Sequence, residues 1–224
     1  MKSPVKDLRS RYLSVAYLRP LIPRGSVSET YLFYSGQVEF GLASHGRFIC
    51  AHTTNQPIYE FWQCLAANSR RLYDIITCPA FKVEDDNMFH VLQETWPKWQ
   101  DPYVRSALFY LLNACSDQGM PSKGAMQPER FHQFSINKLK SYQRPSNFFL
   151  KLDKSDSIHE TIVPAEWSDF TLIPLWDYDH NLFDAGMSLG FEETHVHHKK
   201  LRDTLAALQS KWIVTYNFSK GAQD

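Results

Sequence analysis

The stretch LIPLWDYDHNLF, residues 172 to 183, places chemically active side chains at the end of an apolar run. Asp177, Tyr178, Asp179 and His180 directly follow a segment that is typical of a buried strand. Ligands of open α/β sheets bind beyond the carboxyl ends of the strands, so a carboxylate here can take part in chemistry. The same residue types are equally typical of a solvated turn. Both interpretations stay open at this point.

A second group whose spacing could support chemistry consists of His195, His197 and His198. His195 and His198 would share one face of a helix, and Asp179 and His180 lie nearby in the sequence, which is a pattern that can bind a metal. The four cysteines are scattered, at positions 50, 64, 78 and 115. Because no second pair with ligand spacing exists elsewhere in the sequence, we expect no metal.

Positive charge is concentrated in one short segment that contains Lys138, Lys140 and Arg144. Lysine and arginine together number 24, and so do aspartate and glutamate, so no global field attracts nucleic acid. Any contact with nucleic acid must therefore be local. A solvated surface and a surface that meets phosphates both agree with this segment.

The elements that would position these residues alternate between strands and helices. Helical spacing of apolar residues runs from 57 to 77 and from 102 to 115, each beginning at a proline. A short helix is expected after a Ser135 cap, and another over residues 194–210. Apolar segments at 31–34 and 37–42 precede the predicted strands, which are 47–52, 147–152, 170–176 and 211–218. This order predicts a parallel sheet interrupted by an insert.

Several short motifs follow one another in an order that is known from one enzyme family. These are YLFYSGQVEF, TTNQPIYEFW, RSALFYLLN, LIPLWDYD, HKKL and KWIVTYN. Over roughly residues 29 to 217 they resemble the adenine-specific DNA methyltransferases of the Dam type. The family has E-P-F-x-G-x-G, an Asp-Ile-Asn turn, A-x-x-F-x-x-L-N, D-P-P-Y, a helix opening with His and Leu, and a strand ending in Ser-x-Asn at these places.

The resemblance implies an α/β fold with a Rossmann-like methyltransferase core. Residues 29–90 and 165–224 would form this core, after a lead-in segment at 1–28, and a mainly helical insert at 91–164 would correspond to the target-recognition region. The cofactor would be S-adenosylmethionine and the partner DNA. The implied site residues are Phe33, Gly36, Thr53 and Asn55 for the cofactor, Asp177 and Tyr178 for catalysis on a flipped adenine, and Lys138, Lys140 and Arg144 for DNA.

Departures from the family pattern bear on the chemistry. Gly36 lies between Ser35 and Gln37, whose side chains would crowd the place of the methionine portion. Thr53 replaces the acid that binds the ribose, so a charge-assisted hydrogen bond of about 1.5 to 3 kcal/mol becomes a neutral one. No Pro-Pro pair follows Asp177.

Two functions follow from this comparison of motifs. The favoured one is a degenerate, catalytically inactive homologue that acts as a DNA- or protein-binding or assembly module. The alternative is an active adenine-specific methyltransferase in which Asp177 accepts from the amine.

Cellular location is inferred from features that the sequence lacks. No apolar run approaches the roughly 20 residues of a membrane helix, and the start of the chain does not have the order of a signal peptide. Scattered cysteines agree with a reducing compartment. We therefore expect a soluble, cytoplasmic protein without a membrane partner.

Overall fold

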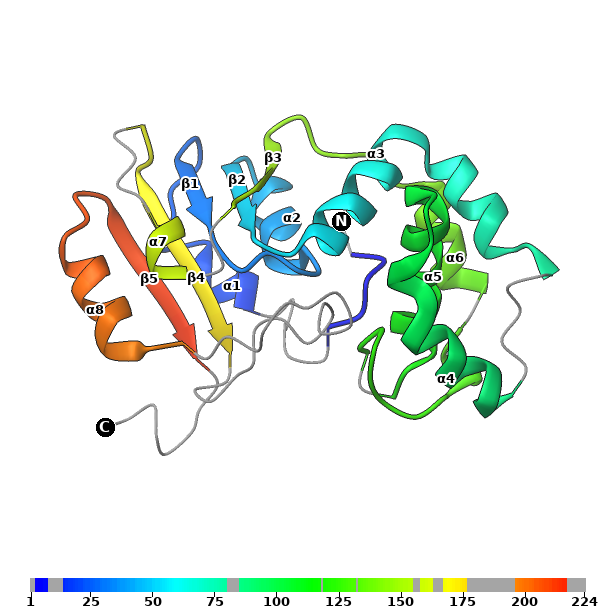
Figure 1. Ribbon diagram of the computed structural model, residues 1–224. Helices are drawn as coiled ribbons and strands as arrows, with labels where there is room; N and C mark the ends of the chain where they lie inside the picture. Colours follow the sequence, from blue (N-terminus) through cyan, green and yellow to red (C-terminus); the bar gives the residue numbers. More distant parts are fainter. Residues whose placement is uncertain are drawn as a thin grey trace.

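The computed structural model describes residues 3–7, 14–79, 85–117, 119–131, 133–154, 158–162, 167–176 and 196–216. In these ranges the chain forms an α/β fold around a five-stranded sheet (Figure 1). The strands are β1 (Val27–Thr30), β2 (Phe48–Thr53), β3 (Phe148–Leu152), β4 (Phe170–Trp176) and β5 (Lys211–Tyr216). The helices are α1 (Ser14–Leu18), α2 (Gln37–Ala43), α3 (Gln56–Ile76), α4 (Asp86–Thr95), α5 (Pro102–Cys115), α6 (Gln133–Lys140), α7 (Ile158–Thr161) and α8 (His198–Ala206), with short 3-10 helices at Trp96–Lys98 and Pro128–Arg130.

All neighbouring strands of the sheet run parallel, in the order β3-β2-β1-β4-β5. The central strand is β1, where Glu29 lies opposite Cys50 of β2 and Thr171 of β4. The order changes direction between β1 and β4, and such a switch point is where open α/β sheets bind their ligands. Rossmann-like sheets begin with the same strand order, so the fold is compatible with that class. The predicted parallel sheet is confirmed.

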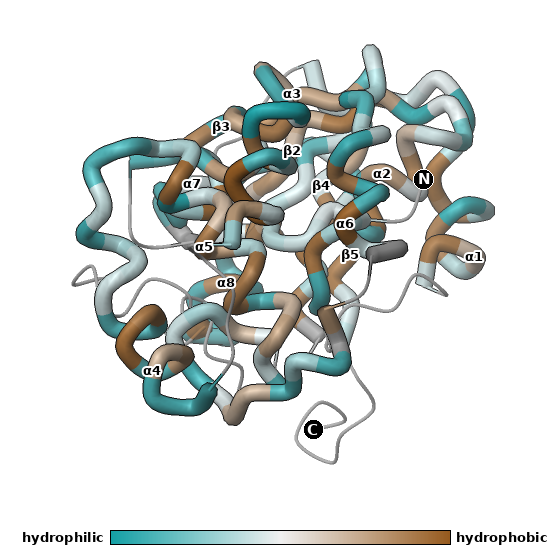
Figure 2. The backbone as a smooth tube through the Cα atoms, turned by 90° about the vertical axis from the view of Figure 1, so that its right-hand side faces the viewer, coloured by the Kyte–Doolittle hydropathy of each residue, from teal (hydrophilic) through white to brown (hydrophobic). Residues whose placement is uncertain are grey.

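The sheet separates the buried apolar residues into two clusters, because successive side chains of a strand point to opposite faces. One face carries Ile49 and Phe148 and packs against α2 and α3. The other carries Ile173, which belongs to one cluster with Leu201 and Leu205 of α8. In Figure 2, brown hydrophobic segments lie mostly among the strands and the helices that contact them, and teal segments lie mostly at the periphery.

A helical part stands beside the sheet and consists of the second half of α3 together with α4, α5 and α6 (Figure 1). Asp101 caps α5 by accepting from the backbone N–H groups of Tyr103 and Val104. Aromatic packing joins α3 to α5: the Phe61 ring centroid lies 5.2 Å from that of Phe109 and 6.2 Å from that of Tyr110. Because α3 begins at the carboxyl end of β2 and ends in this helical part, it connects the two.

Several predicted elements are confirmed, and one predicted helix cap is wrong. The helices predicted from Pro57 and Pro102 are α3 and α5, and the strands predicted at 47–52, 147–152, 170–176 and 211–218 are β2 to β5. The predicted Ser135 cap is wrong, because α6 begins two residues earlier, at Gln133. The helix predicted over 194–210 is the shorter α8 within the described residues. β3 lies within residues 91–164, the expected mainly helical insert, where the sequence predicted a strand.

The central strand was not found by its apolar character. The chain turns at residues 31–35, where Leu32 has a φ of 60°, and the strand is the preceding VSET, residues 27–30. Ser28, Glu29 and Thr30 are all buried there. A polar strand at the centre of a sheet gives no hydropathy signal, so the sequence pattern favoured the neighbouring apolar residues.

Candidate functional site

The turn after β1 holds Gly36, the first of the residues that the family resemblance assigns to the cofactor. Gly36 has a φ of 69° and forms the N-terminal boundary of α2. A Cβ placed on it would lie 2.5 Å from Cε2 of Phe40. Both the left-handed backbone and the ring of Phe40 therefore require glycine here. The group that leaves no room for a side chain at position 36 is therefore the ring of Phe40.

Phe33, the second of these residues, lies inside the aromatic core. Its ring centroid is 5.5 Å from that of Phe148, 5.6 Å from that of Trp62 and 6.2 Å from that of Phe40. Only 2% of its surface is exposed. Phe33 therefore contributes to packing between the sheet and α2 and α3.

Thr53 and Asn55 at the end of β2 are engaged in starting α3. The Thr53 hydroxyl accepts from the backbone N–H of Asn55 at 3.2 Å. The Asn55 side chain accepts from the backbone N–H of Ile58 at 3.1 Å and caps the helix. Both side chains are buried. Their polar groups thus satisfy local backbone groups of the β2–α3 connection.

The N-terminal segment Ser3–Asp7 closes the same end of the sheet, and we call it the strap. Asn113 of α5 holds it from both sides: its Oδ1 accepts from the Lys6 backbone N–H at 2.9 Å, and its Nδ2 donates to the Lys6 carbonyl at 2.9 Å. The Ser35 hydroxyl donates to the Asp7 carboxylate at 3.3 Å. Val5 is buried. The strap therefore covers the turn that contains Gly36.

These positions do not fit S-adenosylmethionine in the arrangement described. Phe33, Thr53 and Asn55 are each at most 4% exposed, and the space beside Gly36 contains the Phe40 ring. The Ser35 hydroxyl, next to Gly36, donates to Asp7 of the strap. A small hollow of about 10 Å³ lies at the ends of β1 and β2, lined by Tyr31, Leu32, His52, Thr53, Thr54, Asp153 and Thr161. That volume accommodates about one water molecule.

Sequence reasoning missed a buried group of titratable side chains on the sheet face that carries Tyr31. His52 of β2 lies between two carboxylates, with Nδ1 2.9 Å from Asp153 and Nε2 3.5 Å from Glu29. The Cys50 sulfur is 3.7 Å from the same Nε2. Tyr31 stacks on the imidazole at a centroid distance of 4.6 Å and donates its hydroxyl to Glu29. The group brings together residues from three neighbouring strands and their ends.

The charge of His52 follows from these neighbours. Burial by itself lowers the pKa of an imidazole, but hydrogen bonds with Asp153, Cys50 and Glu29 outweigh it and raise the pKa of His52 to about 11. His52 is therefore a cation at neutral pH, held between carboxylates of β1 and of the segment after β3. Through these contacts His52 joins β2 to Glu29 of β1 and to Asp153 after β3.

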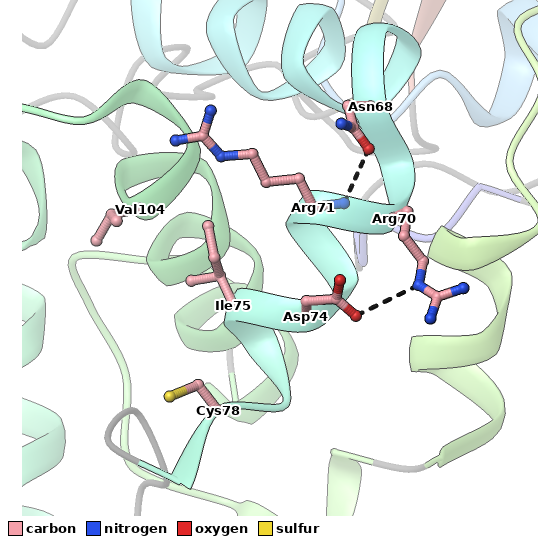
Figure 3. Close-up of a pocket in the computed structure, with 7 residues that line it drawn as sticks. All are labelled: Asn68, Arg70, Arg71, Asp74, Ile75, Cys78 and Val104. Carbon is pink, nitrogen blue, oxygen red and sulfur yellow. Dashed lines mark hydrogen bonds and ion pairs between the residues drawn. The ribbon is translucent and has the colours of Figure 1, made fainter.

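The basic residues expected to meet DNA lie in the helical part, away from the carboxyl ends of the strands. Lys138 and Lys140 are in the last turn of α6, and Arg144 follows in an exposed segment. In the same helical part, between α3 and α5, lies an open hollow of about 570 Å³ lined by Asn68, Arg70, Arg71, Asp74, Ile75, Cys78 and Val104 (Figure 3).

Some residues singled out in the sequence lie outside the described ranges. These are Asp177, Tyr178, Asp179, His180 and His195. His198 lies at the start of α8, where its Nδ1 is 2.9 Å from the Tyr216 hydroxyl. Among the residues that the structure describes, no three His, Cys, Asp or Glu side chains are grouped so as to hold a metal ion.

Comparisons with known proteins add no family to this description. A comparison with known protein families finds no match, and a comparison with curated protein sequences finds no significant match. Within the described ranges, no helix combines the length and the apolar character that crossing a bilayer requires.

Proposed function

We propose that this chain is a methyltransferase-like module that binds DNA and has lost methyl transfer. The observation that carries the proposal is that the protein's own groups occupy or bond the positions that the resemblance assigns to the cofactor. The Phe40 ring lies against Gly36, and Thr53 and Asn55 satisfy the start of α3. Methyl transfer requires the donor methyl and the acceptor amine to be placed with great accuracy. A buried and internally bonded cofactor site does not offer that placement.

Binding of DNA by the helical part is supported by a local group of basic residues in a chain without net charge. The formal net charge is zero, so a local surface has to supply the attraction. Lys138, Lys140 and Arg144 supply it on and just after α6. Phosphate contacts of this kind do not depend on a functioning cofactor site. A scaffold that no longer methylates DNA can therefore still bind it.

A two-part experiment tests this function. Unmethylated plasmid DNA is incubated with the protein and tritium-labelled S-adenosylmethionine, and binding of a fluorescent 20-base-pair duplex is followed by anisotropy. We expect no labelled DNA and salt-dependent binding of the duplex. Incorporation of label that rises with protein concentration would show an active enzyme. Failure to bind the duplex at 50 mM salt would remove the DNA part of the proposal and leave a protein-binding module.

A further inference from the structure

Two helices that are far apart in the sequence lie side by side in the helical part. The Ser69 hydroxyl of α3 donates to the Lys140 carbonyl of α6 at 3.5 Å. The Lys140 ammonium lies 5.2 Å from the centroid of the Tyr73 ring, which is one turn further along α3. The second half of α3 and the last turn of α6 therefore form one continuous surface.

A kink in α3 determines which side chains reach that surface. Asn68 leaves the helical conformation, with φ −155° and ψ 80°, and its Oδ1 accepts from the backbone N–H of Arg71 at 2.9 Å. The side chain thus caps the restarted helix. Figure 3 shows the result: Arg71 points toward α5, and Arg70 points to the opposite side, toward α6.

The two arginines differ in how far they are committed to internal contacts. The Arg71 guanidinium lies 2.6 Å from Asp101, the cap of α5, and 4.2 Å from the centroid of the Tyr103 ring. Arg71 therefore joins α3 to α5. The guanidinium of Arg70 pairs with Asp74 at 3.5 Å, and its side chain is 71% exposed. An exposed pair of this kind contributes little free energy, so Arg70 can exchange Asp74 for another anion.

We propose that Arg70 belongs to one phosphate-binding surface with Lys138, Lys140 and Arg144, and we call these four residues the insert surface. The inference rests on the proposed DNA-binding function and extends it to a residue of α3. The sequence places Arg70 about 70 residues from the other three, and the contacts of Ser69 and Tyr73 with Lys140 place its helix against the last turn of α6. Cations gathered on one surface are complementary to the repeated negative charge of a nucleic-acid backbone.

The test measures binding of the fluorescent 20-base-pair duplex between 50 and 200 mM salt. We expect Arg70→Ala to weaken binding several-fold at low salt and to reduce the slope of log affinity against log salt by about 1, because one phosphate contact is lost. Asp74→Ala removes the competing carboxylate and should strengthen binding. A surface that is only solvated responds to neither change.

Arg202→Ala is the matched control. The Arg202 side chain is also 71% exposed and pairs with a neighbouring carboxylate, Asp203, but it lies on α8, which packs against β4. We expect this variant to bind the duplex like the unaltered protein. Circular dichroism and thermal unfolding of all three variants should be unchanged, since each altered side chain is largely exposed.

The outcomes separate the inference from the function on which it rests. If the unaltered protein binds no duplex, the DNA-binding function fails and the inference fails with it. If the unaltered protein binds but Arg70→Ala behaves like Arg202→Ala, only the inference is overturned. A loss of slope confined to Arg70→Ala, with stronger binding by Asp74→Ala, supports both.

Discussion

At the scale of single residues, the sheet contains a buried charged group that the sequence pattern does not predict. His52 carries its positive charge between Asp153 and Glu29, and these contacts raise its pKa to about 11. Because that pKa lies above the ordinary value of 6.5, the charge contributes fully to stability below about pH 6.5. The contribution declines as the pH rises toward 11.

We expect Asp153→Asn to lower the free energy of unfolding by about 3 kcal/mol at pH 7, because a buried cation loses one of its carboxylates. The difference from the unaltered protein should shrink between pH 7 and pH 10. Urea unfolding measures both. Asp74→Asn is the control, since the Asp74 side chain is 59% exposed and its pair with Arg70 should contribute less than about 1 kcal/mol. Equal losses for the two variants would contradict this role for Asp153.

Glu39 gives a prediction of the same sign over a lower pH range. Burial in α2, reinforced by Asp7 of the strap, raises the pKa of Glu39 from 4.5 to about 7. The folded state therefore holds this proton more tightly than the unfolded state, and stability is lost as the pH rises through this range. We expect Glu39→Gln to be more stabilising at pH 8 than at pH 5, by about 2 kcal/mol. The same effect at both pH values would show that Glu39 does not titrate there.

At the scale of elements, the strap closes the carboxyl end of the sheet through Asn113. Both backbone groups of Lys6 bond this one side chain, and the Lys6 ammonium donates to the Ala114 carbonyl. Val5 of the strap is buried, and Asp7 accepts from Ser35. Its closure should therefore depend strongly on Asn113.

We expect Asn113→Ala to release the strap locally. Loss of the two hydrogen bonds should raise the exchange rate of the Lys6 amide hydrogen by about 30-fold, which corresponds to about 2 kcal/mol of local protection. Hydrogen exchange followed by NMR measures it. Asn147→Ala is the control, because Asn147 also bonds two backbone carbonyls, those of Ala43 and Arg47, in a different part of the fold. An equal increase in both variants would indicate general destabilisation instead.

Elements also differ in how well the sequence predicts them. Pro57 and Pro102 mark the starts of α3 and α5, and four apolar strands are recognisable because their residues are buried together. β1 escaped notice because a polar VSET segment forms it. The kink at Asn68 was not predicted, because no proline marks it in the sequence. The Asn68 side chain caps the second half of α3.

At the scale of the whole molecule, the described chain consists of a parallel sheet and a helical part beside it. The parallel sheet was predictable from the alternation of strands and helices, whereas the strand order and the switch point between β1 and β4 are known from the structure. The cluster around His52 was not predictable, because Glu29, Cys50 and Asp153 meet only through the register of three strands. The packing of the Phe40 ring against Gly36 was likewise not predictable from the sequence.

A calorimetric titration of the full chain with S-adenosylmethionine tests the central claim most directly. We predict no saturable heat up to millimolar ligand, because the Phe40 ring adjoins Gly36 and the strap covers the turn. Saturable binding at micromolar ligand would contradict the claim that the protein's own side chains occupy the cofactor site.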